Sequence, residues 1–307
     1  MPATRVRLIA PSGYPHDHAA MARGVARLRE AGCVLDGLEV LERIELRYAG
    51  NDAERAADIN ALATLDALPD IALAIRGGYG ATRLLEHLNY DALRERLSGT
   101  DTVLVGHSDF TAIQMALYAK SGLVTLGGPM LGPDFGAETL SGLTLPHFWR
   151  TIRSAQGGAE WNSSGGHALD VEGPLWGGNL AMICSLLDTP YFPRIDGGIL
   201  FVEDVGEPSY RIERLLYQLH LAGVLGRQHA LILGDFTDCR HGANDNGYDL
   251  SAGFAQIRRV IGIPVIDGLP IGHEPDKFTL PFGVPARLRV DGGKAWLGFS
   301  GYPHLSP

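Results

Sequence analysis

Short apolar runs and amphipathic stretches alternate along the first half of the chain. Apolar runs predict strands at 5–10, 71–75 and 102–105. The run at 71–75 is apolar throughout, as is typical of a strand buried on both faces of a parallel sheet. Apolar residues at helical spacing predict helices at 18–31, 53–68, 81–88 and from 110 onward. The repetition of strand, tight turn and helix predicts a doubly wound α/β domain.

The second half of the chain is richer in strand-like segments. A block rich in Gly, Ser and Asn at 156–167 predicts a linker between domains at 1–155 and 168–307. Beyond the linker, strands are predicted at 198–202, 230–233 and within 286–299, and helices at 210–221 and 254–260. This mixture predicts a second domain of the α+β class, rich in strands.

Composition and charge exclude several classes of function for this protein. The 307 residues carry a formal net charge of −9, which argues against a nucleic-acid surface because such a surface needs clustered Lys and Arg. Neither a secretory signal nor an apolar run of membrane length is evident, so we expect a cytoplasmic protein without a membrane partner. Cys33, Cys184 and Cys239 are far apart and lack the spacing of a disulfide framework or a metal site. We therefore predict no cofactor and no metal.

A serine follows the predicted strand at 102–105, in the block GHSD at 106–109. A turn from strand to helix can present Ser108 as a nucleophile and place the next backbone N–H near a developing oxyanion. The block departs from the esterase pattern G-x-S-x-G, because Phe110 occupies the last glycine position. The alternative is a serine that only caps the following helix. His107 is expected to point away from the serine.

A glycine-rich turn, RGGYG at 76–80, follows the predicted strand at 71–75. Neither a dinucleotide fingerprint nor a phosphate loop is present. Gly78 is a candidate oxyanion-hole donor, because this turn and Ser108 share one edge of the predicted sheet. Arg76 could bind a substrate carboxylate, or it could pair with a neighbouring acid. The turn could equally be a tight connection without a catalytic role.

A carboxylate and a histidine complete the candidate chemistry. Glu203 ends a buried apolar run, where a charge requires a partner, although it or Asp204 could instead cap the helix that begins near Pro208. His273 lies in a loop with Pro and Gly on both sides, and it could also be an ordinary exposed histidine. A serine hydroxyl needs a base such as histidine, and a carboxylate orients that base.

Six blocks, in this order, resemble the LD-carboxypeptidases, also called muramoyltetrapeptide carboxypeptidases. They are LIAPSGY at 8–14, RGGYG at 76–80, GHSDFTA at 106–112, LWGGNL at 175–180, the Glu203-Asp204 strand end with Arg211 and Arg214, and GHE at 272–274. The resemblance implies a flavodoxin-like or amidotransferase-like first domain and a metal-free, cytoplasmic, usually dimeric enzyme. It also implies a triad of Ser108, Glu203 and His273, with an oxyanion hole formed by the backbone N–H groups of Gly78 and Asp109.

The implied activity is cleavage of the L,D-peptide bond before the terminal D-alanine of a murein tetrapeptide, in cell-wall peptide recycling. Candidate substrate contacts are Arg76, Tyr79, Trp176 and Asn179. One alternative is a peptidase resembling the microcin-immunity branch, which cleaves an aminoacyl-nucleotide amide. That branch is less favoured because no long insertion is evident between Gly234 and Gly272. A second alternative is a non-catalytic binding protein on a flavodoxin-like scaffold.

Overall fold

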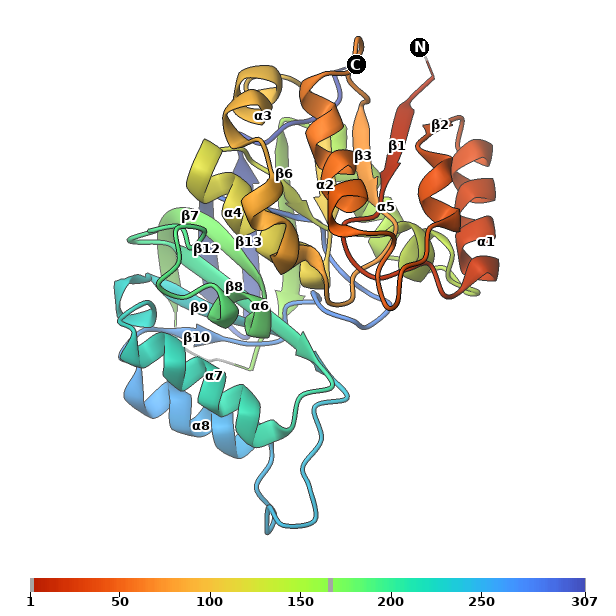
Figure 1. Ribbon diagram of the computed structural model, residues 1–307. Coiled ribbons are helices and arrows are strands. Elements are labelled where there is room, and N and C mark those ends of the chain that lie inside the picture. The colour runs from red at the N-terminus through yellow and green to blue at the C-terminus, as the bar shows by residue number, and fades with distance from the viewer. Residues whose placement is uncertain (1–2, 165–167, 307) are drawn as a thin grey trace.

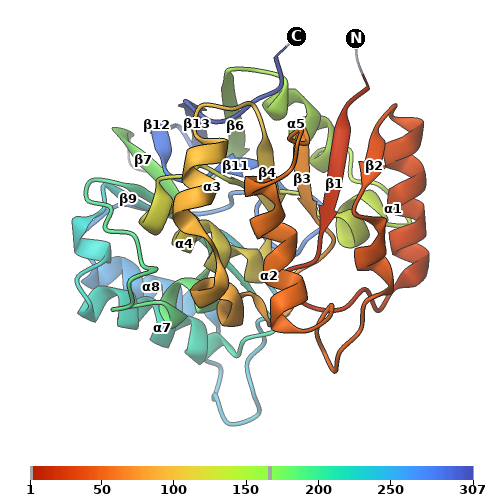
Figure 2. The same ribbon diagram turned by 45° about the horizontal axis from the view of Figure 1, so that its top comes forward.

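Two twisted β-sheets, one formed mainly by each half of the chain, are the framework of the structure (Figures 1 and 2). The structure is a computed structural model that describes residues 3–164 and 168–306. None of the helices in these ranges is both long enough and apolar enough to cross a membrane.

The first sheet has six strands in the order β11-β5-β4-β3-β1-β2. Its members are β1 (Arg5–Ile9), β2 (Val34–Asp36), β3 (Ile71–Ala74), β4 (Val103–Gly106), β5 (Leu126–Gly127) and β11 (Leu280–Pro281). All pairs are parallel except β11 with β5. The order 2-1-3-4-5 of the parallel strands is that of flavodoxin-like folds. The predicted α/β class of the first domain is confirmed.

Helices cover both faces of this sheet, because successive side chains of its strands point to opposite sides. In β3, Ala72 and Ala74 pack into one apolar cluster with α2, α3 and α4, whereas Ile71 and Leu73 pack into another with α1 and α5. The helices are α1 (His18–Glu30), α2 (Asp52–Asn60), α3 (Tyr90–Leu97), α4 (Thr111–Ser121) and α5 (Thr144–Ile152).

Five short helical segments accompany these helices. They are η1 (Leu38–Glu42), η2 (Ala61–Ala63), η3 (Ala81–His87), η4 (Ser108–Phe110) and the π-turn η5 (Leu131–Phe135). Among them, η2, η3 and η4 overlap regions where helices were predicted. The helix predicted at 53–68 ends as an α-helix at Asn60 and continues only as the 3₁₀ turn η2. The helix predicted at 81–88 is a 3₁₀ segment.

The second sheet has seven strands in the order β10-β9-β8-β7-β12-β13-β6. Its members are β6 (Gln156–Asn162), β7 (Leu169–Asn179), β8 (Ile199–Val205), β9 (Ala230–Thr237), β10 (Val265–Ile266), β12 (Val284–Asp291) and β13 (Lys294–Ser300). The strands from β10 to β7 are parallel, and those from β7 to β6 are antiparallel. Its helices are α6 (Leu180–Ser185), α7 (Ser209–Leu221), η6 (Leu225–Arg227) and α8 (Leu250–Val260). The predicted strand-rich second domain is confirmed.

The segment predicted as a linker, 156–167, contains an edge strand of the second sheet. Gln156–Asn162 form β6, which pairs with β13 along its whole length. The Gly and Asn residues of this segment hid the alternation of buried and exposed side chains that buries Ala159 and Trp161. The remainder at 165–167 lies outside the described residues. The linker prediction is therefore wrong for 156–162.

Segments of the second half also reach into the first. Strand β11 pairs with β5 at the edge of the first sheet, and the loop that precedes it carries His273. Each of the two large apolar clusters contains residues from both halves, such as Phe110 with Trp176. Residues from distant parts of the sequence can therefore be held together rigidly in a site between the sheets.

Candidate active site

Ser108 lies on the sharp turn between β4 and α4. Its φ of 63° is in the left-handed region that a serine seldom adopts. The turn depends on Gly106, because a Cβ at that position would lie 2.4 Å from the Phe110 ring. Backbone strain of this kind is concentrated at functional sites. The turn places Ser108 at the carboxyl edge of the parallel sheet, where ligands of flavodoxin-like folds bind.

The glycine loop after β3 lies directly against this turn. A Cβ on Gly77 would lie 2.8 Å from Ser108 Cβ, and Gly78 has a φ of 87°. The buried carboxylate of Asp109 accepts a hydrogen bond from the Ala81 backbone N–H at 2.6 Å, which joins the loop to the turn. Gly78 and Asp109 therefore both belong to segments that adjoin the serine. Their role as oxyanion-hole donors stays a prediction.

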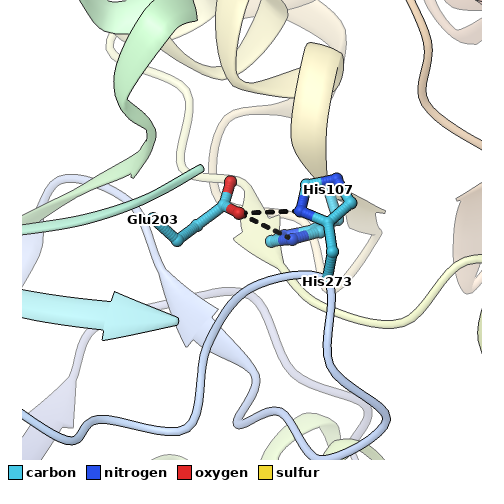
Figure 3. Close-up of side chains that lie close together, drawn as sticks. All are labelled: His107, Glu203 and His273. Carbon is cyan, nitrogen blue, oxygen red and sulfur yellow. Dashed lines mark hydrogen bonds and ion pairs between the residues drawn. The ribbon is translucent and has the colours of Figure 1, made fainter. Parts of the chain in front are cut away.

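Three side chains form a continuous chain of hydrogen bonds. His273 Nε2 lies 2.9 Å from Ser108 Oγ, and His273 Nδ1 lies 2.8 Å from Glu203 Oε2. Figure 3 shows the carboxylate of Glu203 pointing at the His273 ring. This is the arrangement in which a carboxylate orients an imidazole and the imidazole takes a proton from a hydroxyl. The structure thus brings together three predicted residues that are up to 165 positions apart.

Glu203 is fully buried near the end of β8, and its surroundings favour its charged form. Burial alone raises the pKa of this carboxyl, but the proximity of His107 and the hydrogen bond from His273 outweigh burial and lower the pKa below its usual value. Neither Glu203 nor Asp204 caps α7. The N-cap of this helix is Pro208, and no side-chain hydrogen bond caps the helix there. The capping alternative is therefore wrong, and Glu203 is free to orient His273.

The loop that carries His273 is attached to the first half of the molecule. Lys277 is buried and pairs with the equally buried Asp134. Thr144 bridges the loop by donating to the Pro275 carbonyl at 2.7 Å and accepting from the Lys277 backbone N–H at 2.9 Å. These contacts fix His273 relative to Ser108, although the two residues come from different halves of the chain.

His107 lies next to Glu203 and His273, a position that the sequence analysis did not predict. Its Nε2 lies 3.8 Å from Glu203 Oε2, and its ring centroid lies 5.1 Å from that of His273 (Figure 3). Burial lowers the pKa of His107 to about 4, so its ring is neutral at neutral pH. His107 has an extended backbone (φ −149°, ψ 169°), its side chain is buried, and it is not among the residues that line the cavity beside Ser108.

Both halves of the chain match domain models of the same protein family. Residues 6–128 match the model of the LD-carboxypeptidase N-terminal domain, and residues 172–288 match that of the LD-carboxypeptidase C-terminal domain. The chain belongs to the LD-carboxypeptidase family. Membership indicates a carboxypeptidase.

Relatives of known name cover almost the whole of this LD-carboxypeptidase chain. It is 32% identical over 303 residues to a murein tetrapeptide carboxypeptidase of Pseudomonas aeruginosa, with 92% of each chain covered. It is 30% identical to the microcin C7 self-immunity protein MccF of Escherichia coli, covering 88% of this chain and 85% of that protein. A crystal structure of muramoyltetrapeptide carboxypeptidase from Oxalobacter formigenes superposes with a TM-score of 0.90 at 43% identity, covering 98% of this chain and 100% of that one.

A cavity of about 410 Å³ opens beside the triad of this LD-carboxypeptidase, lined by Ser108, His273, Gly78 and Arg76. Arg76 is part-buried and donates to the Tyr14 carbonyl at 3.0 Å, and burial lowers its pKa. No ion pair joins Arg76 to an acid among the described residues, so the alternative of pairing with a neighbouring acid is wrong. A cation without a carboxylate partner therefore faces the cavity.

The other three residues predicted to contact substrate differ in their exposure to solvent. Trp176 is fully buried and donates to Gln228 Oε1, so its predicted contact with substrate is wrong. Asn179 is also buried: it caps α6 and donates to Asp204 Oδ1 at 3.0 Å, which makes it a structural residue. Tyr79 is exposed on the glycine loop, and its contact with substrate stays a prediction.

Proposed function

We propose that this protein is a serine carboxypeptidase that cleaves the L,D-peptide bond before the terminal D-alanine of murein tetrapeptides, as part of cell-wall peptide recycling. The observation that carries the proposal is the hydrogen-bonded chain from Ser108 through His273 to Glu203 at the wall of a cavity that also contains Arg76. The similarity to a murein tetrapeptide carboxypeptidase supports this substrate class. We further propose a cytoplasmic location and a homodimer.

The geometry supports an acyl-enzyme mechanism. Ser108 Oγ attacks the carbonyl carbon of the scissile bond while His273 Nε2 accepts its proton. Glu203 stabilises the imidazolium through Nδ1–H, and the backbone N–H groups of Gly78 and Asp109 donate to the oxyanion. His273 then gives the proton to the leaving amine of D-alanine, which frees the amino acid. Water, activated by the same imidazole, hydrolyses the acyl-enzyme.

Arg76 supplies the selectivity expected of a carboxypeptidase. Such an enzyme must recognise a free terminal carboxylate, and a guanidinium binds carboxylates through two parallel hydrogen bonds. The part-buried position of Arg76 strengthens that interaction, because desolvated charges attract each other more strongly than exposed ones.

A comparison of substrates tests the proposal. The purified protein is incubated with murein tetrapeptide, with and without a chelator, and with an aminoacyl sulfamoyl nucleotide. We expect free D-alanine from the tetrapeptide at the same rate in both conditions, and slower cleavage of the nucleotide conjugate. Faster cleavage of the conjugate would favour the function of the relative MccF. Absence of turnover with either substrate, together with binding of one of them, would favour a non-catalytic role.

A further inference from the structure

Two polar atoms beside the triad lack the partners that buried groups normally have. His107 is 4% exposed and Glu203 is 0% exposed. Within the described part of the chain, His107 Nε2 and Glu203 Oε1 have no hydrogen-bond partner. Most buried polar side-chain atoms in proteins do have a partner, so two such atoms in one small volume call for an explanation.

The side chains of His107 and Glu203 lie next to His273, a third potential metal ligand. One ligand atom each from His107, Glu203 and His273 lies within 4.8 Å of the others, and the three side chains converge in Figure 3. Two imidazoles and one carboxylate are a donor set that zinc accepts in proteins. Bonds of about 2.1 Å in a tetrahedral site separate neighbouring ligand atoms by about 3.4 Å. The observed separations from Glu203 Oε2, 2.8 Å to His273 Nδ1 and 3.8 Å to His107 Nε2, bracket that value.

We propose that His107, Glu203 and His273 form an inhibitory site for a zinc ion. The ion coordinates His107 Nε2, a Glu203 oxygen and His273 Nδ1, and water fills the fourth position. His273 lines the cavity with a partly exposed side chain, which gives the ion a route from solvent. The ion would share Glu203 and His273 with the triad, so its inhibitory effect rests on the proposed peptidase function, in which the ion takes no part.

The proposed inhibition follows from the tautomer of His273. In the active arrangement the ring proton is on Nδ1, bonded to Glu203, and Nε2 is free to accept the proton of Ser108. Zinc on Nδ1 moves that proton to Nε2, so the nitrogen that faces the serine becomes a donor. The serine then has no base, and Glu203 no longer orients the ring.

Zinc binding is measured directly, without substrate. The full chain is treated with chelator, desalted and titrated with zinc chloride in competition with a chromophoric zinc indicator. The same titration is made with His107→Phe, which keeps a ring beside His273, and with His229→Gln, which removes an exposed histidine far from the site. Circular dichroism checks the fold of each variant, and His107→Gln replaces His107→Phe if the latter does not fold.

The wild type and His229→Gln should each bind one zinc ion per chain, and that ion should stop turnover until chelator is added. Loss of a surrounding residue typically weakens metal affinity by 10–100-fold, so loss of the His107 ligand should weaken it by at least about tenfold. Zinc sensitivity, measured relative to each variant's own rate, should fall in parallel. Absence of stoichiometric binding by the wild type, or affinity of His107→Phe within about twofold of it, overturns the proposal. Because binding is read without substrate, a failure of the proposed peptidase function would leave this result interpretable.

Discussion

Replacement of Lys277 by methionine tests how His273, the proposed base, is held against Ser108, the proposed nucleophile. The Lys277 side chain is 5% exposed and that of its partner Asp134 is 3% exposed. Removing one member of a buried pair leaves an uncompensated charge and costs about 3–5 kcal/mol. Asp134 keeps one hydrogen bond, which it accepts from the Met130 backbone N–H at 2.7 Å. We therefore expect the free energy of unfolding to fall by about 3 kcal/mol, the lower end of this range. The loosened His273 loop should also lower kcat, by up to about 100-fold, because small displacements of a catalytic group are costly.

Urea unfolding measures the loss of stability, and the rate of D-alanine release from the tetrapeptide measures kcat. Adding Asp134→Asn to Lys277→Met removes the buried charge and should restore most of the unfolding free energy. Arg287→Met is the matched control, since it breaks an ion pair with Asp170 whose side chains are 55% and 45% exposed, and it should cost less than about 1 kcal/mol. A loss in Lys277→Met no greater than that in Arg287→Met would refute the reasoning.

Three further predictions concern the site itself. Gly77→Ala places a methyl group against Ser108 and should lower kcat/KM by at least about 100-fold, whereas Gly142→Ala, with nothing within 4 Å, should leave it unchanged. Arg76→Met should raise KM for the tetrapeptide about 10–100-fold, more than it lowers kcat; a larger effect on kcat would contradict carboxylate binding. As pH falls from 6.5 to about 4, the unfolded chain protonates His107 and the folded chain does not, so the unfolding free energy should fall by as much as about 3 kcal/mol. His107→Phe should flatten that part of the urea-derived stability profile, and an unchanged profile would contradict the neutral buried ring.

The fold could be predicted where local patterns were strong. The apolar run at 71–75 predicted β3, and the repeated strand–turn–helix pattern predicted the parallel sheet. β6 was missed because Gly and Asn are typical of loops, and only the pairing with β13 makes this segment a strand. The position of β11 in the first sheet rests on long-range packing that no local pattern contains.

For the candidate site, the sequence predicted the residues at segment ends but not the orientation of every side chain. Ser108, Glu203 and His273 each follow an apolar segment, and the structure brings them together. Trp176 was misjudged, because its block was known only from resemblance and its burial depends on contacts with Phe192 and Phe282. Similarly, His107 was missed because only tertiary packing brings β8 and its carboxylate next to the nucleophile turn.

The most direct test of the proposed mechanism is the rate of tetrapeptide hydrolysis by Ser108→Ala relative to the wild type. Loss of the nucleophile of a serine triad removes nearly all of its catalysis, so we expect a fall of at least about 10⁴-fold in kcat with an unchanged circular dichroism spectrum. A folded Ser108→Ala protein that releases D-alanine at a rate near that of the wild type would contradict the account.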